Sequence, residues 1–123
     1  MANEIQITSK LNVSKGGASA TNLTSTDTVD MTGDNISSLV QDVGTTYEQV
    51  STGDVATSAA YWLQIYNMDA TNFMYVSYDA GTTNHDIIPP GGLWGPVKKN
   101  ASKVVHVKFD TAAGLANVTS CEA

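Results

Sequence analysis

The amino-acid sequence predicts an all-β fold, a single β-sandwich domain that extends over residues 1–123. Three observations predict this class. Short segments in which apolar and polar residues alternate recur along the chain, and turns rich in Gly, Pro, Asn and Asp separate them. Thr and Ser are abundant, which favours strands and turns over long helices. A chain of 123 residues is also long enough to bury a hydrophobic core without metal or disulfide staples.

The first predicted strand covers residues 4–13, where apolar and polar residues alternate. Such a pattern is typical of a strand with one buried face. The apolar face consists of Ile5, Ile7, Leu11 and Val13. Residues 14–38 are dominated by Ser, Thr, Asp and Gly, so we expect a long polar loop region there, with one short strand near residues 28–32 as an option.

Residues 37–43 are ambiguous between a strand and one or two helical turns, because the apolar residues of this segment also fit helical spacing. The β-branched residues nearby and Gly44 favour the strand. We expect a further strand over residues 45–50 and a turn at residues 51–54.

The next predicted strand has apolar side chains on both faces, Tyr61, Leu63 and Ile65 on one and Trp62 and Tyr66 on the other. A strand of this kind is expected at the centre of a sheet. Residues 67–72 are rich in turn formers, so we expect them to form a hairpin that leads into a strand over residues 73–78.

The Pro-Pro-Gly-Gly segment at residues 89–92 predicts a tight turn between strands at residues 85–88 and 93–97. The last two predicted strands cover residues 103–109 and 115–121. About eight strands with turns at regular spacing indicate a sandwich or barrel, with a jelly roll as the favoured form.

The charge pattern argues against nucleic-acid and membrane partners. The formal net charge is −6, and all 6 basic residues are Lys. Between Gly16 and Val97 there is no Lys or Arg, whereas Asp and Glu occur throughout. Proteins that bind nucleic acid or an anionic membrane neutralise phosphates with clustered Lys and Arg. We therefore expect neither partner.

The start of the sequence carries no basic segment followed by an apolar run, and no stretch approaches the roughly 20 apolar residues that a membrane span requires. The single cysteine, Cys121, cannot form an internal disulfide. We expect synthesis in a reducing cytoplasm.

Residue types that catalysis needs are scarce. Nucleophilic catalysis requires Ser, Cys or Thr beside a base and an orienting group. The only histidines are His85 and His106, and the alternation predicts that His106 lies on an exposed face beside Lys108. No G-x-S-x-G segment occurs. We therefore expect no enzymatic activity and no cofactor.

Three carboxylates, Asp27, Asp30 and Asp34, lie close together in the sequence. Hard cations such as Ca²⁺ bind several carboxylate and carbonyl oxygens gathered on a flexible loop. The segment lacks the EF-hand spacing and its closing Glu. We expect a solvated acidic loop, with a Ca²⁺ site as the weaker alternative.

Aromatic residues supply the candidate binding surface. Aromatic rings at strand spacing are usually core or interface, although they can also stack on sugar rings. Trp94 lies in the Gly-rich segment GGLWGP, where its own domain less easily buries a large ring, so we expect it to anchor a neighbouring chain. The candidate binding or interface residues are Trp94, Trp62, Tyr66 and Tyr78.

The segment YWLQIYNMDATNFMYVSYD, followed by IIPPGG and KVVHVKF, resembles small virion structural proteins of tailed bacteriophages. In that group a strand ending in N-x-D-x-T-N-F/Y pairs with a second strand, and a PG turn and a closing strand with alternating Val or Ala follow. The corresponding residues are Asn67, Asp69, Thr71, Asn72, Phe73, Pro90, Gly91, Val105 and Val107. The resemblance covers roughly residues 44–109 and implies a jelly roll or related sandwich without catalytic residues.

We therefore expect a non-enzymatic protein of the virion, made in the bacterial host cytoplasm, that decorates or cements the outer capsid surface. The expected partner is the major capsid protein or another virion protein. A homo-oligomer, with a trimer favoured, would gain avidity from repeated weak contacts on a symmetric lattice. The alternatives are a tail, neck or adaptor subunit and a receptor- or carbohydrate-binding module.

Overall fold

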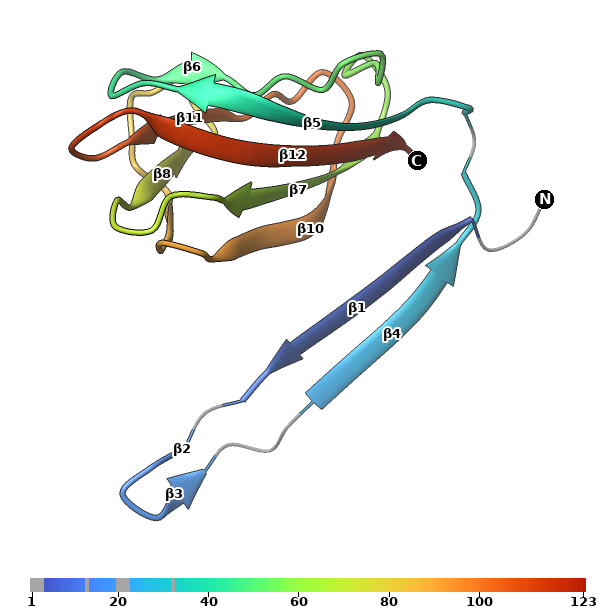
Figure 1. Ribbon diagram of the computed structural model, residues 1–123. Helices are drawn as coiled ribbons and strands as arrows, with labels where there is room; N and C mark the ends of the chain where they lie inside the picture. Colours follow the sequence, from blue (N-terminus) through green and yellow to red (C-terminus); the bar gives the residue numbers. More distant parts are fainter. Residues whose placement is uncertain (1–3, 13, 20–22, 32) are drawn as a thin grey trace. The chain divides into compact units, whose positions relative to one another are not determined.

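The computed structural model describes residues 4–12, 14–19, 23–31 and 33–123 (Figure 1). The chain divides into two compact units, Met1–Thr32 and Gly33–Ala123, called here the N-terminal and the C-terminal unit. The described residues form antiparallel strands and include no helix, which confirms the all-β prediction. The sequence predicted one sandwich domain over residues 1–123, whereas the structure has these two units.

The N-terminal unit is a two-stranded ribbon. Strand β1 (Ile5–Leu11) pairs antiparallel with β4 (Leu23–Val29), and the register runs from Ile5 opposite Val29 to Leu11 opposite Leu23. The two-residue strands β2 (Ser14–Lys15) and β3 (Ala18–Ser19) form a second short pair. Gly16 and Gly17 connect them with positive φ angles, which glycine adopts without steric cost.

The prediction of a long polar loop over residues 14–38 is wrong, because β4 and the start of β5 lie within that range. The β4 sequence LTSTDTV is polar, but its β-branched Thr residues suit an extended backbone. Low apolar content was therefore a poor guide to backbone conformation in this segment.

The prediction that the first strand buries one whole face is also wrong. Ile5 is buried and Ile7 is half-buried, but Leu11 is 74% exposed. Val13, which was assigned to the same face, lies outside the described residues. Burial along β1 therefore decreases from one end of the strand to the other.

The C-terminal unit contains two four-stranded antiparallel sheets (Figure 1). The first sheet has the order β10-β7-β12-β5, with β10 at Leu93–Lys99, β7 at Tyr61–Asn67, β12 at Gly114–Glu122 and β5 at Ile36–Val43. The second sheet has the order β6-β11-β8-β9, with β6 at Glu48–Gln49, β11 at His106–Phe109, β8 at Met74–Ser77 and β9 at Asp86–Ile88.

One hydrophobic core takes side chains from both sheets. Alternate residues of β7, β8, β11 and β12 point into it, as the two-residue period of a strand requires. The first sheet contributes Val43, Tyr61, Leu63, Ile65, Ala116 and Val118, and the second contributes Met74, Val76, Ile88, Val107 and Phe109. Because both sheets bury these residues together, neither sheet forms a stable layer without the other.

Several predicted elements are confirmed. Residues 36–43 form a strand and not a helical turn. Strand β7 lies between β10 and β12, as its apolar residues on both faces indicated. Within the segment predicted as a strand over residues 45–50, only Glu48–Gln49 has strand structure.

The predicted hairpin between residues 61–66 and 73–78 is wrong, because β7 and β8 belong to different sheets. The connecting residues carry the chain from one sheet to the other, and the Asp69 side chain shapes this turn. Asp69 Oδ1 accepts hydrogen bonds from the backbone N–H groups of Thr71 and Asn72, each at 2.8 Å. Asx turns of this kind reverse the chain without requiring that the flanking strands pair.

Asn67 fixes the corner at the end of β7. Its buried Nδ2 group lies 2.9 Å from the carbonyl oxygen of Asn72, 3.2 Å from that of Ile88 and 3.1 Å from that of Pro89. Its backbone N–H donates to the Gly92 carbonyl, and its own carbonyl accepts from the Gly91 N–H. One side chain thus joins the β7–β8 connection to the β9–β10 connection.

We expect Asn67→Ala to lower the free energy of unfolding by about 3 kcal/mol, because buried carbonyl groups lose their donor. Urea denaturation at neutral pH measures this change. Asn117→Ala is the matched control, since Asn117 is half-buried on the other face of the same sheet. Its expected cost is within about 1 kcal/mol. Equal losses for the two variants would contradict the role given to Asn67.

Candidate functional site

The structure distributes the sequence-predicted site residues over separate places. Tyr78 and Trp94 lie in one cluster, with ring centroids 6.3 Å apart. Trp62 and Tyr66 lie four residues apart on β7 and share its face away from the core. The three candidate Ca²⁺ ligands divide between the units, with Asp27 and Asp30 in the N-terminal unit and Asp34 in the C-terminal unit.

Tyr78 and Trp94 meet at a shared carboxylate. Asp86 Oδ2 accepts a 2.8 Å hydrogen bond from the Trp94 indole N–H and a second hydrogen bond from the Tyr78 hydroxyl. The His85 ring stacks on Tyr78 at 4.7 Å, and Lys99 Nζ lies 4.7 Å from the centre of the Tyr78 ring. We call these five residues, Tyr78, His85, Asp86, Trp94 and Lys99, the Asp86 cluster.

The cluster joins the edges of the two sheets. Asp86 belongs to β9, the last strand of the second sheet, and Trp94 belongs to β10, the last strand of the first sheet. Trp94 points toward the core side of its sheet, opposite Ile65, and packs against the buried core. The Asp86 cluster therefore holds the two sheets together along one side.

Hydrogen bonding and burial shift the acidities within the cluster. Burial and then the hydrogen bond to Asp86 raise the pKa of Tyr78 to about 12. The hydrogen bonds from Tyr78 and Trp94 lower the pKa of the Asp86 carboxyl below its ordinary value. Asp86 is thus ionised and Tyr78 is neutral at physiological pH. The Asp86 carboxylate can therefore accept from both the Tyr78 hydroxyl and the Trp94 indole N–H.

The loop between β8 and β9 is ordered by a second carboxylate. Asp79 Oδ1 accepts hydrogen bonds from the Ser77 hydroxyl at 2.7 Å and the Thr83 N–H at 2.9 Å. The Ser77 hydrogen bond is the main reason that the pKa of Asp79 lies at about 2. Asp79 Oδ2 also lies 3.9 Å from His85 Nε2. The charged groups of this loop are therefore engaged in holding its own shape.

The Asp86 cluster is ill suited to stacking a ligand. The Tyr78 ring is contacted by both His85 and Lys99, and the Trp94 ring is half-buried against the core. The indole N–H and the phenol hydroxyl already have an acceptor. The geometry gives Trp94 and Tyr78 a structural role within this chain.

The expected exposure of His106 is wrong. The residue is half-buried, and its Nδ1 atom is buried without a hydrogen-bond partner among the described residues. His85 Nδ1 accepts a hydrogen bond from the Tyr78 backbone N–H. No hydrogen bond in the described part of the chain joins either histidine to a Ser, Thr or Cys side chain that could act as nucleophile.

The outer face of the first sheet carries several exposed apolar side chains among polar ones. On the side away from the core, β5 presents Ile36 and Val40, which are 68% and 54% exposed. Leu93 of β10, Tyr66 of β7 and Leu115 of β12 are exposed on the same face. Exposed apolar side chains that gather on one sheet face are a mark of contact surfaces.

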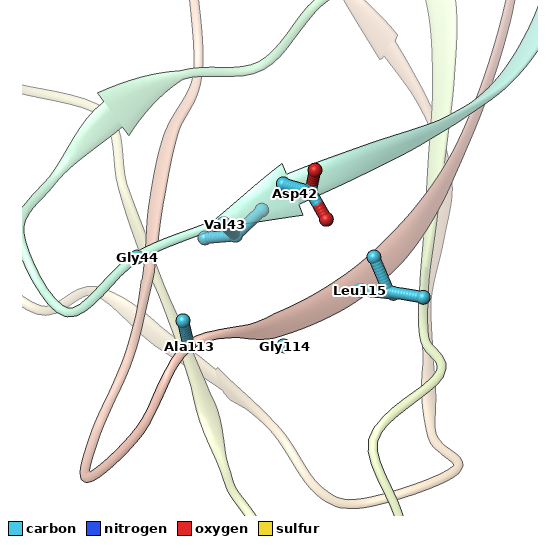
Figure 2. Close-up of a pocket in the computed structure, with 6 residues that line it drawn as sticks. All are labelled: Asp42, Val43, Gly44, Ala113, Gly114 and Leu115. Carbon is cyan, nitrogen blue, oxygen red and sulfur yellow. The ribbon is translucent and has the colours of Figure 1, made fainter.

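An open pocket of about 460 Å³ lies where β5 ends and β12 begins (Figure 2). Its lining residues are Asp42, Val43, Gly44, Ala113, Gly114 and Leu115. Figure 2 shows Asp42 and Leu115 on the two neighbouring strands, and Asp42 is the sole titratable side chain among the lining residues. A carboxylate without a partner acid, base or nucleophile offers no catalytic constellation.

The described residues offer neither a metal-binding cluster nor a membrane-spanning helix. Within residues 4–12, 14–19, 23–31 and 33–123, no group of three His, Cys, Asp or Glu side chains could hold a metal ion. Asp27 Oδ1 accepts a hydrogen bond from the neighbouring Thr28 N–H in β4. No helix in this part of the chain is long and apolar enough to cross a membrane.

Comparisons of the chain with protein-family models, with curated proteins and with solved structures found no match.

Sequence reasoning missed Ile36, Val40 and Leu115 as surface residues. A signal for the first two was present, because read as a strand, residues 36–43 place apolar side chains on both faces. Only one face of an edge strand can meet its own core. The apolar residues of the other face were therefore candidates for an external contact.

We expect the folded protein to lose stability as the pH rises from 10 towards 12. Tyr78 has an ordinary pKa of 10.0 and a folded pKa of about 12, so its contribution is complete below pH 10 and disappears as the pH rises through the folded value. Urea midpoints measured from about pH 8 to about pH 11.5 should fall less steeply for Tyr78→Phe than for the natural chain.

Some alkaline loss should remain in Tyr78→Phe, because burial also raises the pKa of Tyr47 and of Tyr61. Tyr66→Phe serves as control, since Tyr66 lies outside the cluster, and it should follow the natural chain. Identical curves for Tyr78→Phe and the natural chain would show that the hydroxyl has no such role.

Proposed function

We propose that this chain is a non-enzymatic structural protein of a bacteriophage virion that decorates or cements the outer capsid surface through multivalent contacts. The observation that carries the proposal is the N-terminal ribbon. From Thr8 to Leu11 in β1 and from Ser25 to Thr28 in β4, the side chains of both ribbon faces are exposed. This part of the ribbon therefore has no core of its own.

A two-stranded hairpin without a core is marginally stable in water, whereas a third strand or a packing surface stabilises it. The ribbon offers sites for either. Among the described residues no third strand pairs with β1 or β4, and one face carries Ile5, Ile7 and Leu11, with Asp27 opposite Ile7. A subunit that docks on a large assembly supplies the missing surface. We therefore assign the ribbon as the attachment arm, with the major capsid protein or another virion protein as its partner.

The strand order of the C-terminal unit supports the proposal that this unit is a β-sandwich of the jelly-roll type. Counted from β5 to β12, the first sheet contains strands one, eight, three and six in spatial order, and the second contains strands two, seven, four and five. This alternation between sheets is that of two nested Greek keys, the topology of the double-sheet jelly roll. Viral capsid domains and lectins both use this fold.

Charge and chemistry agree with a place on the outside of a shell. The net charge of −6 and the absence of Arg do not suit contact with packaged DNA. Repeated weak contacts on a symmetric lattice would give a small homo-oligomer high avidity. A neck, tail or adaptor position would use the same arm. A carbohydrate-binding role is less favoured, because Tyr78 and Trp94 are engaged within the chain.

The proposal is tested on shells assembled with and without the protein. We expect shells that carry it to resist heat and osmotic shock better, because each bound subunit adds interface between capsid subunits. Ile7→Asn should lower its occupancy on shells by about tenfold or more, since a polar amide would replace the apolar side chain in the contact.

Thr8→Asn is the matched control, because Thr8 lies on the opposite ribbon face, across from Thr26, and receives the same uncharged amide. It should leave occupancy within about threefold of the natural chain. Equal resistance of shells with and without the protein would exclude cementing, and equal effects of the two variants would exclude the assigned face.

A further inference from the structure

The two sheets of the C-terminal unit have four edges, and three of them are protected against pairing with another chain. The edge strands β6 and β9 are only two and three residues long. Strand β10 has a register shift between Trp94 and Val97, contains Pro96 without an N–H group, and ends in Lys98 and Lys99. Short strands, irregular registers, Pro and Lys are the usual devices that block edge pairing.

The fourth edge, β5, has none of these devices. It is eight residues long, pairs with β12 without a register shift, and contains no Pro, Gly or Lys. Among the described residues, no further strand pairs with its free side. Asp42 is its single charged residue. A regular, long and nearly uncharged edge is a template for an added strand.

We propose that β5 pairs antiparallel with β5 of a second copy of this chain, across a twofold axis at Val40. In this register Val40 lies opposite Val40 of the partner, and Ser38 lies opposite Asp42 of the partner, twice by symmetry. The two four-stranded sheets become one continuous eight-stranded sheet. This inference does not depend on the proposed function.

The side chains of β5 favour this register over its neighbours. Ser38, Val40 and Asp42 share the outer face of the sheet, as their pairing with β12 shows. With the axis at Val40, two apolar side chains meet at the centre, and each carboxylate faces the polar Ser38 side chain and not an apolar or like-charged one. With the axis at Leu39, Asp42 would instead face Ile36. With the axis at Ser38, the carboxylates of Asp42 and Asp34 would face each other.

The same features identify the occupant as a second copy. A twofold contact requires a patch that is complementary to itself, and β5 meets this requirement in the register with Val40 at the axis, where no like charges face each other. Each Asp42 lies two residues from the axis, on opposite sides of it, so four residues separate the two carboxylates along the strands and they do not face each other. Leu115, exposed opposite Asp42 on β12, borders the contact. Such a contact builds dimers, in place of the trimer that the sequence alone favoured.

Disulfide trapping tests both the pairing and its register in the full-length chain. In a Cys121→Ser background, which removes the native thiol, Val40→Cys should form a covalent dimer under mild oxidation. Residues directly opposite on antiparallel strands have Cα atoms about 4.5–5.5 Å apart, a distance that a disulfide spans. Ser38→Cys in the same background should stay unlinked, because the two copies of residue 38 lie about 13 Å apart along the strand.

Light scattering over a range of concentrations provides the second measurement. The natural chain should form a dimer. Val40→Lys should raise the dissociation constant of the dimer by about tenfold or more, because like charges then lie directly opposite each other. Ile87→Lys adds the same charge on exposed Ile87 of the second sheet and should leave the dimer intact. Unchanged thermal unfolding of the Val40→Lys monomer would show that the variant still folds.

A monomeric natural chain at every concentration would overturn the proposal. So would an oligomer that Val40→Lys leaves unchanged and Val40→Cys does not trap, because another segment or another protein would then occupy the edge. Trapping through Ser38→Cys in place of Val40→Cys would overturn the register.

Discussion

The Asn67 side chain lies where three segments of the C-terminal unit meet, and two of the connections between the sheets, β7–β8 and β9–β10, depend on it. Its amide contacts the carbonyl groups of Asn72, Ile88 and Pro89, while its backbone exchanges hydrogen bonds with Gly91 and Gly92. A buried amide with its hydrogen bonds satisfied defines one arrangement of these connections, because other arrangements would leave polar groups unpaired. The apolar core packs around this fixed corner.

The two edges of the first sheet differ in their contacts, since β10 is bonded to the second sheet through the Asp86 cluster and β5 is free on one side among the described residues. On one side, Asp86 bonds to Trp94 and Tyr78 and so ties β9 to β10. On the other side, β5 has exposed Ile36 and Val40 beside a free backbone edge. The polar and aromatic residues that drew attention in the sequence stabilise the fold, whereas plain aliphatic residues make up the surface available for contact.

The sequence predicted elements well where the apolar pattern within a segment decides its conformation. It predicted them poorly where contacts between residues distant in the sequence decide it. Apolar residues on both faces of residues 61–66 identified a central strand, and β7 does lie between β10 and β12. It did not identify β4, whose Thr residues pair without burial. Turn residues located the β7–β8 connection but not its crossing, because the contacts of Asn67 with Ile88 and Pro89 are distant in sequence. Tyr78 and Trp94 were candidates singly, and only the fold unites them at Asp86.

The strands of the two sheets differ in length, from seven to nine residues in the first sheet but from two to four in the second. A long ladder resists shear through many parallel hydrogen bonds, whereas short ladders depend on side-chain packing to hold their place. Amide protons of the second sheet should thus open to solvent in smaller, less costly motions. In mechanical terms, the first sheet is the stiffer one and can transmit load, whereas the second sheet is more compliant and can adjust to it.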